Sequence, residues 1–143
     1  MEVRDRCKHN QIGAYMIREF DDNKDYDEYS SWFNHLGYAP PTRGMLSTLG
    51  FTIYKEIDIC SGFLYISNSN LAYIEFVIAN PKAKREDRKE GVKKLLTHLQ
   101  DLAKSKGYEI IMIITATPGF SKNLIENFGY IKGPVSIEHY KEI

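Results

Sequence analysis

A strand, a charged loop, a helix and a second strand follow one another between Leu71 and Thr115, and no other feature constrains the fold as much. LAYIEFVIANP is rich in β-branched and aromatic residues, and YEIIMIIT is almost wholly apolar, as is typical of a strand covered on both faces. Between them, VKKLLTHLQDLAKSKG carries its leucines on one helical stripe and ends at Gly107. This order predicts a βαβ unit with parallel strands, whose helix N-terminus lies where an anion can bind.

The segments on either side of this unit predict further strands and helices. Residues 49–57, 60–67 and 71–79 predict an antiparallel meander with a hairpin turn at 68–70. Before the meander we expect a strand over 12–20 and a helix that begins at the aspartates of 21–27. Its aromatic residues recur at three- and four-residue intervals until Gly37. After the unit we expect a short helix over 121–128 and a last strand over 135–140.

Composition excludes several classes of protein. The 143 residues suit a single domain, 1–143, and 43% hydrophobic with 27% charged residues is ordinary for a soluble globular chain. Nineteen basic residues balance nineteen acidic ones, so we expect no nucleic-acid or membrane partner. The charged N-terminus is unlike a secretory signal, and two cysteines are too few for a disulfide framework, so the cytoplasm is the expected location. The four histidines lack ligand spacing, and no metal site is expected.

The start of the predicted helix, residues 82–94, permits two interpretations. It holds seven basic and three acidic residues. Asp87 and Glu90 have the spacing of a capping box, in which the carboxylate of Asp87 would bond the first helix amides and leave none for a ligand. Alternatively, the basic side chains hold the phosphates of a ligand by charge.

Glu75 is the candidate catalytic carboxylate. Strict alternation along the strand places it on one face with Leu71, Tyr73, Val77 and Ala79, and places Ala72, Ile74, Phe76 and Ile78 on the other. It is then the one charge in a central strand, and it could take a proton from an amine, directly or through water. The alternative is a glutamate at an open cleft of the sheet, or one paired with a lysine.

The element order from about Ala14 to Tyr140 resembles the GNAT N-acetyltransferase superfamily. The best local marks are VIANP (77–81), the leucine pair 95–96 followed by DLAKSKGYEIIMI, and LIENFGY (124–130). More loosely, the chain resembles the small GNAT-like proteins that bacteriophages encode. The resemblance implies an α/β, three-layer fold with a mixed, mostly antiparallel sheet flanked by helices. It also implies acetyl transfer from acetyl-CoA to an amine, on a small molecule or a protein that the sequence does not identify.

The resemblance further implies roles for particular residues. Glu75 would be the general base, and the backbone of Ile78 and Ala79 would pair with pantetheine. The residues expected to hold the phosphates are Arg88, Lys89, Gly91, Val92, Lys93 and Lys94. The glycine-rich turn of the family, Arg/Gln-x-x-Gly-x-Gly/Ala, has its nearest match at Arg88-x-x-Gly91-x-Lys93. Alignment on the leucine pair instead places Glu90 and Val92 at the glycine positions.

The chain also departs from the family. Ile125 stands where the family usually has a tyrosine general acid, and Tyr130 or Tyr140 would have to replace it. These departures favour a second hypothesis, a catalytically silent GNAT-like protein that serves as a protein-binding or structural module, with residues 26–38 and the PPTRG loop as its docking surface. The two hypotheses differ in whether acetyl-CoA binds. In either, the edge of the last strand could form a homodimer contact.

Overall fold

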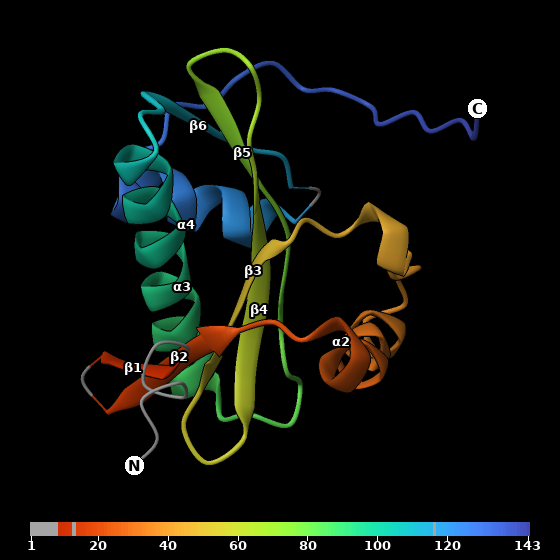
Figure 1. The fold of residues 1–143 in the computed structure, drawn as a ribbon, viewed down its shortest axis with the longest axis vertical. Coiled ribbons are helices and arrows are strands. Elements are labelled where there is room, and N and C mark those ends of the chain that lie inside the picture. Colours follow the sequence, from red (N-terminus) through yellow and green to blue (C-terminus); the bar gives the residue numbers. More distant parts are fainter. Residues whose placement is uncertain (1–8, 13, 116) are drawn as a thin grey trace. The chain divides into compact units, whose positions relative to one another are not determined.

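The computed structural model describes residues 14–115 and 117–143, and the backbone alone of residues 9–12 (Figure 1). The chain divides into two compact units, Met1–Ile113 and Ile114–Ile143. The first unit contains a six-stranded sheet in the order β1-β2-β3-β4-β5-β6. The strands are β1 (His9–Ile12), β2 (Tyr15–Glu19), β3 (Leu49–Tyr54), β4 (Asp58–Tyr65), β5 (Leu71–Ala79) and β6 (Ile110–Ile113).

The sheet confirms the predicted meander and the parallel pair. Strands β3, β4 and β5 pair antiparallel, and β5 pairs with β6 in parallel. The strand expected over 12–20 is confirmed as β2, but it is shorter than predicted, because Ile12 belongs to a separate strand, β1, that pairs antiparallel with β2. The helix that joins β5 to β6 completes the βαβ unit, so the sheet is mixed and mostly antiparallel, as expected.

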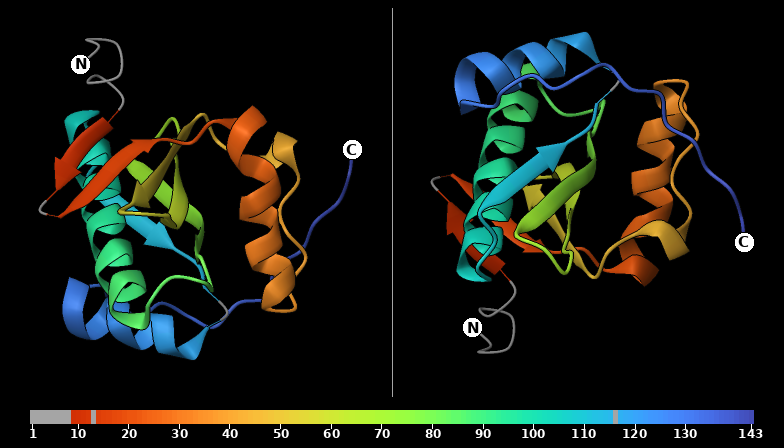
Figure 2. Two further views of the ribbon diagram at one scale, coloured as in Figure 1. Left: turned by 90° about the horizontal axis from the view of Figure 1, so that it is seen from below. Right: turned by 90° about the horizontal axis from the view of Figure 1, so that it is seen from above.

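Two helices cover opposite faces of this sheet (Figure 2). Helix α2 (Asp22–His35) begins at its N-cap Asp21, whose carboxylate accepts from the amides of Asn23 and Lys24. The chain leaves this helix through Gly37, whose φ of 81° needs a glycine. A 3₁₀ turn, η1 (Arg43–Met45), precedes β3. Helix α3 (Arg85–Ser105) packs on β3, β4 and β5 through its buried leucines, as the stripe predicted.

The face of the sheet that carries α2, the α2 face, has an aromatic core. Tyr29, Trp32, Phe63 and Ile78 are buried there, and Phe20, Phe33 and Phe76 are among the residues packed against them. The Tyr29 ring meets those of Phe20, Phe33 and Phe63 edge to face at centroid distances of 5.2 to 5.6 Å, an arrangement worth more than burial alone. The predicted aromatic helix therefore serves first as core.

A β-bulge in β5 changes which residues share a face. Between the pairs Ser61↔Ile78 and Phe63↔Glu75, two residues of β5 stand opposite one residue of β4, and Phe76 has a φ of 58°. Phe76 packs with the α2-face core, whereas a Cβ on Gly62 would meet Val77 and Leu95 on the α3 face. The strict alternation expected for β5 was therefore wrong beyond Glu75. The residues on the α2 face are Leu71, Tyr73, Glu75, Phe76 and Ile78.

Strand β6 is shorter and less covered than the sequence predicted. Ile110 is 52% exposed and Met112 is 42% exposed. Covering on both faces was therefore a wrong prediction. In the described part of the chain, no helix is both long and apolar enough to cross a membrane. Cys60 is a buried core residue, as expected, while Cys7 lies outside the described residues.

The second unit contains one of the two predicted elements. Helix α4 (Pro118–Phe128) starts at a proline in its first turn and ends at Gly129, whose φ is 73°. The strand expected over 135–140 was wrong, because residues 129–143 have no regular structure and Val135 and Ile137 are more than 80% exposed. Alternating apolar residues give only the capacity for a strand, which also needs a neighbour to pair with.

His98 makes an acid-sensitive contact between α3 and β3. Its ring meets that of Phe51 at 4.5 Å, its Nε2 has no hydrogen-bond partner among the described residues, and burial lowers its pKa despite nearby Asp101. The unfolded chain therefore binds a proton more readily, so stability should be full above about pH 6.5 and should fall as the pH drops below it. The loss should be about 1.4 kcal/mol per unit of pKa difference.

Denaturant midpoints at pH 8, 6 and 5 measure this loss. His98→Leu should flatten the pH dependence between pH 8 and 5, and exposed His139→Gln is the control that should retain it. Asp87, whose pKa is lowered below 3.8, acts only at more acidic pH. An unchanged slope in His98→Leu would show that His98 is not the titrating group.

Candidate active site

Strands β5 and β6 separate halfway along β5. Their register ends at Ile74↔Ile113, so the paired part of β5 and β6 stops there and the second half of β5, residues 75–79, lies beyond it. The amide of Asn80 donates to the Ile59 carbonyl at 2.7 Å, toward β4. Because neighbouring strand residues point their amides in opposite directions, the amide and carbonyl of Ala79 face the opening. The Ile78 backbone instead faces β4, so of the two expected pantetheine partners only Ala79 presents its backbone to the opening.

Glu75 lies where the two strands part, next to the bulge. The hydroxyl of buried Tyr29 donates to the Phe76 carbonyl at 2.9 Å and fixes the bulge to α2. Phe63 stands opposite Glu75 on β4. Helix α2 therefore holds the backbone that carries the candidate base, through a contact that no sequence pattern predicted.

Tyr65 is a second residue of this site that sequence analysis missed. Its hydroxyl donates to the Met45 carbonyl at 2.7 Å and accepts from the Ser47 amide at 3.2 Å, which holds the loop before β3. Burial raises the pKa of Tyr65 to about 12, and the charge of nearby Glu75 contributes to that rise. The available signal was its spacing of two from Phe63, which places both residues on one face of β4.

The start of α3 differs from the predicted capping box. The helix begins at Arg85, its N-cap is Lys84, and the Lys84 side chain makes no capping hydrogen bond. Asp87 lies in the first turn and not at the cap. Its carboxylate accepts from the Tyr15 hydroxyl at 2.7 Å and lies 3.6 Å from the Lys55 ammonium. These contacts lower the pKa of Asp87 and raise that of Tyr15 to about 12. Because Asp87 is engaged with Tyr15 and Lys55, its carboxylate does not cap the first amides of α3.

Most of the charges at the start of α3 lie on two flanks, and the exposed carboxylate of Glu86 lies beside the basic one. At about 100° per residue, Arg85, Lys89 and Lys93 follow one another along one exposed flank, which we call the basic stripe. Asp87, Glu90 and Lys94 occupy the other flank, which we call the acidic flank. It faces β2 and Lys55, and there Lys94 pairs with Glu90 at 3.8 Å. Because β2 and β6 lie at opposite sides of the sheet, the basic stripe is on the flank nearer the β5–β6 opening.

Several residues expected to hold phosphates have other roles. Arg88 turns back to the loop and donates to the Ala83 carbonyl and, at 3.5 Å, to that of Pro81. Gly91 is buried in the second turn of α3, and a Cβ there would lie 2.7 Å from the Ile59 side chain. Its glycine therefore permits close packing of α3 on β4, and does not expose an amide. Val92 is half-buried in the same turn.

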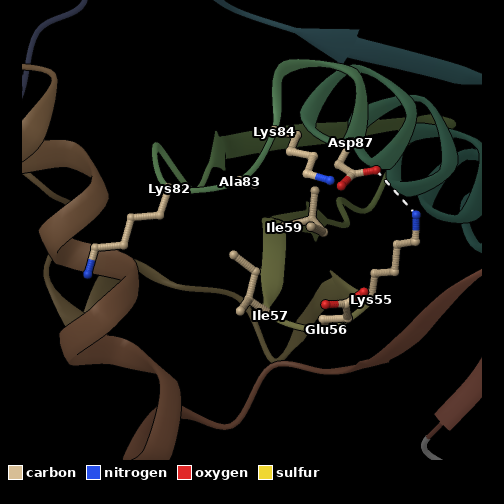
Figure 3. A pocket seen from close by; sticks show the side chains of 8 residues that line it. All are labelled: Lys55, Glu56, Ile57, Ile59, Lys82, Ala83, Lys84 and Asp87. Atoms are coloured by element: carbon tan, nitrogen blue, oxygen red, sulfur yellow. Dashed lines mark ion pairs between the residues drawn. The ribbon is translucent and has the colours of Figure 1, made fainter.

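A cavity of about 180 Å³ lies on the acidic flank of α3 (Figure 3). Figure 3 shows Lys55 paired with Asp87 and Lys82 extending away toward α2. The lining comes from the β3–β4 turn, β4, the β5–α3 loop and the first turn of α3, and it includes no residue of β6 or of the second half of β5. This cavity is therefore separate from the β5–β6 opening. Its lining residues are Lys55, Glu56, Ile57, Ile59, Lys82, Ala83, Lys84 and Asp87.

The remaining candidates for proton transfer, Tyr130 and Tyr140, belong to the second unit, as does Ile125 at the position of the family's tyrosine. The replacement of the family's tyrosine by Tyr130 or Tyr140 stays a prediction. No group of three or more possible metal ligands occurs among the described residues.

With this geometry, the chain has the fold of the GNAT N-acetyltransferases. An Escherichia coli ribosomal-protein-S18-alanine N-acetyltransferase aligns over 84% of this chain and 79% of its own, with a TM-score of 0.66 and 14% identity. An aminoglycoside acetyltransferase from an uncultured soil metagenomic sample, solved with sisomicin, aligns over 90% and 96% (TM-score 0.62, 15% identity). Neisseria gonorrhoeae N-acetylglutamate synthase, solved with coenzyme A and L-arginine, aligns over 76% of this chain and 26% of its own (TM-score 0.62, 16% identity). No protein-family model and no curated protein matches the chain.

Proposed function

We propose that the protein is an acetyl-CoA-dependent N-acetyltransferase. The observation that carries the proposal is the alignment of three features along one half of β5. Glu75 lies where β5 and β6 part, Ala79 offers its backbone to the opening, and the first turn of α3 follows directly after the strand. N-acetylglutamate synthase, 26% of which aligns with this chain, was solved with coenzyme A, which supports a CoA ligand here.

The residues of the first unit suit this ligand. The amides of the first turn of α3 carry the positive end of the helix dipole and would bind the pyrophosphate, with Lys89 and Lys93 of the basic stripe beside it. The Ala79 amide and carbonyl would bond the pantetheine amides as a short strand does. Acetyl-CoA, when bound, supplies the thioester carbonyl that an amine attacks. Glu75 would hold the acceptor ammonium and take a proton from it, and the neutral amine would attack the thioester carbonyl to form the new C–N bond. The C–S bond would then break, and CoA would leave as a thiolate that takes up the proton released by the amide nitrogen.

The alternative of a catalytically silent module has less support from the structure than from the sequence. Its strongest physical argument was that Asp87 would cap α3 and occupy the phosphate site, and Asp87 binds Tyr15 and Lys55 instead. The aromatic residues of 26–38 that would have docked a partner include Tyr29 and Trp32, which are buried.

Calorimetric titration with acetyl-CoA and with CoA tests the proposal. Micromolar binding is expected. Lys89→Glu/Lys93→Glu should weaken it by about tenfold or more, because each reversal replaces an attraction to phosphate by a repulsion. Lys104→Glu/Lys106→Glu, at the other end of α3, is the matched control and should bind like the unchanged protein. No heat and no thermal stabilisation at millimolar acetyl-CoA would overturn the acetyltransferase proposal.

A further inference from the structure

We propose that the acceptor is an apolar monoamine, in which a single ammonium is attached to a flat or branched hydrocarbon body. This inference rests on the proposed function, because it describes the other substrate of the same site. It follows from the side chains that surround Glu75 on the α2 face.

The face beside Glu75 is apolar and partly open. Register places Tyr73 beside Met112 and Leu71 beside Ile110 across the parallel pair. Ile110 is 52% and Met112 is 42% exposed, and Leu71, Tyr73 and Glu75 are half-buried. The side chains of β5 and β6 on this face thus form an apolar strip that reaches solvent and has a carboxylate at one end.

Glu75 is the single charged residue that these strands contribute to the face. Three strands contribute side chains to this part of the face: β5, β6 and the part of β4 that begins at Ser61. Their residues on the face are Ser61, Phe63, Tyr65, Leu71, Tyr73, Glu75, Phe76, Ile78, Ile110 and Met112. One carboxylate matches one ammonium. A polyamine would place its further ammonium groups against hydrocarbon, and a phosphorylated amine would place its phosphate where these strands offer no cation. Each arrangement removes a charge from water without pairing it, which costs free energy of binding.

The dimensions of the strip also suit a small hydrocarbon body. Tyr73 lies two residues from Glu75 on the same face, a spacing of about 7 Å, and β6 is about 5 Å further across the sheet. An amine at Glu75 with one or two carbons before its ring would therefore place the ring against Tyr73 and Met112. The bulge contributes Phe76 to the same wall, since it turns that side chain to the α2 face.

The test compares 2-phenylethylamine, spermidine and glucosamine 6-phosphate as acceptors for the full chain, measured as CoA thiol release. We expect kcat/KM for 2-phenylethylamine to exceed the other two by at least about tenfold. Met112→Glu adds a second carboxylate to the strip. It should change the ratio of kcat/KM for 2-phenylethylamine to that for spermidine by at least about tenfold in favour of spermidine, and Ile110→Glu should change this ratio in the same direction. Ile57→Glu, a 46% exposed residue beside the separate cavity, is the matched control and should leave the ratio unchanged.

The outcomes separate this inference from the proposed function. Two results would overturn the apolar acceptor but not the proposed function. The first is a protein that binds acetyl-CoA but prefers spermidine or glucosamine 6-phosphate as acceptor. The second is a ratio of kcat/KM for 2-phenylethylamine to that for spermidine that stays unchanged in both glutamate variants, while thermal melts show both to be folded. If no amine is acetylated, calorimetry measures the affinity of the CoA-bound protein for each of the three amines. The inference is overturned if 2-phenylethylamine does not bind, or binds no more tightly than spermidine and glucosamine 6-phosphate. Absent acetyl-CoA binding overturns the proposed function itself.

Discussion

Glu75→Gln is expected to lower kcat/KM for acetyl transfer by about 10²- to 10⁴-fold, the range of a lost general base. Glutamine keeps the size of the side chain but cannot take the proton of the acceptor ammonium. The loss should appear in kcat and, because Glu75 also holds the acceptor ammonium, in KM for the amine. The calorimetric affinity for acetyl-CoA should stay unchanged, because the cofactor contacts proposed at Ala79 and the α3 start remain.

The matched control for Glu75→Gln is Glu56→Gln, which removes a carboxylate from the cavity on the acidic flank of α3. This variant should retain full activity. Activity that survives Glu75→Gln but not Glu56→Gln would place the chemistry in the cavity, and would contradict the assignment of Glu75.

Gly50→Ala is expected to destabilise the protein by about 3 kcal/mol, at the upper end of the cost of overpacking a core. A Cβ at Gly50 would lie 2.3 Å from Cε2 of Phe63, a contact that real structures do not tolerate. Phe63 cannot simply move, because it is fully buried and its ring packs against those of Phe20 and Tyr29 at 5.0 and 5.6 Å. Urea denaturation measures the change in the free energy of unfolding.

Gly44→Ala is the matched control, since a Cβ at Gly44 meets nothing within 4 Å. It should change the free energy of unfolding by less than about 0.5 kcal/mol, as is usual at a surface position. Because Phe63 stands opposite Glu75, Gly50→Ala should also reduce activity at temperatures where the protein is still folded. Equal stability of the two variants would show that the α2-face core is looser than the structure indicates.

The sequence predicted the features that depend on local patterns. The aspartates before α2 and Gly37 after it marked a helix, because an N-cap carboxylate and a glycine with positive φ act within a few residues. The leucine stripe predicted which side of α3 is buried, and the runs from Leu49 to Ala79 predicted the meander. Glu75 was a candidate on the same grounds, as the one carboxylate in a strand of hydrophobic residues.

The features that form the candidate site depend on contacts between distant segments, and only the tertiary structure decided them. The bulge at Phe76 is held by Tyr29, forty-seven residues away, so no local pattern could show that alternation fails there. Asp87 has the spacing of a capping box, but the Tyr15 hydroxyl and the Lys55 ammonium bind its carboxylate from β2 and the β3–β4 turn. The periodicity of a sequence predicts the structure that a segment can form by itself. The partner of a carboxylate and the position of a β-bulge depend on segments that only the fold brings near them.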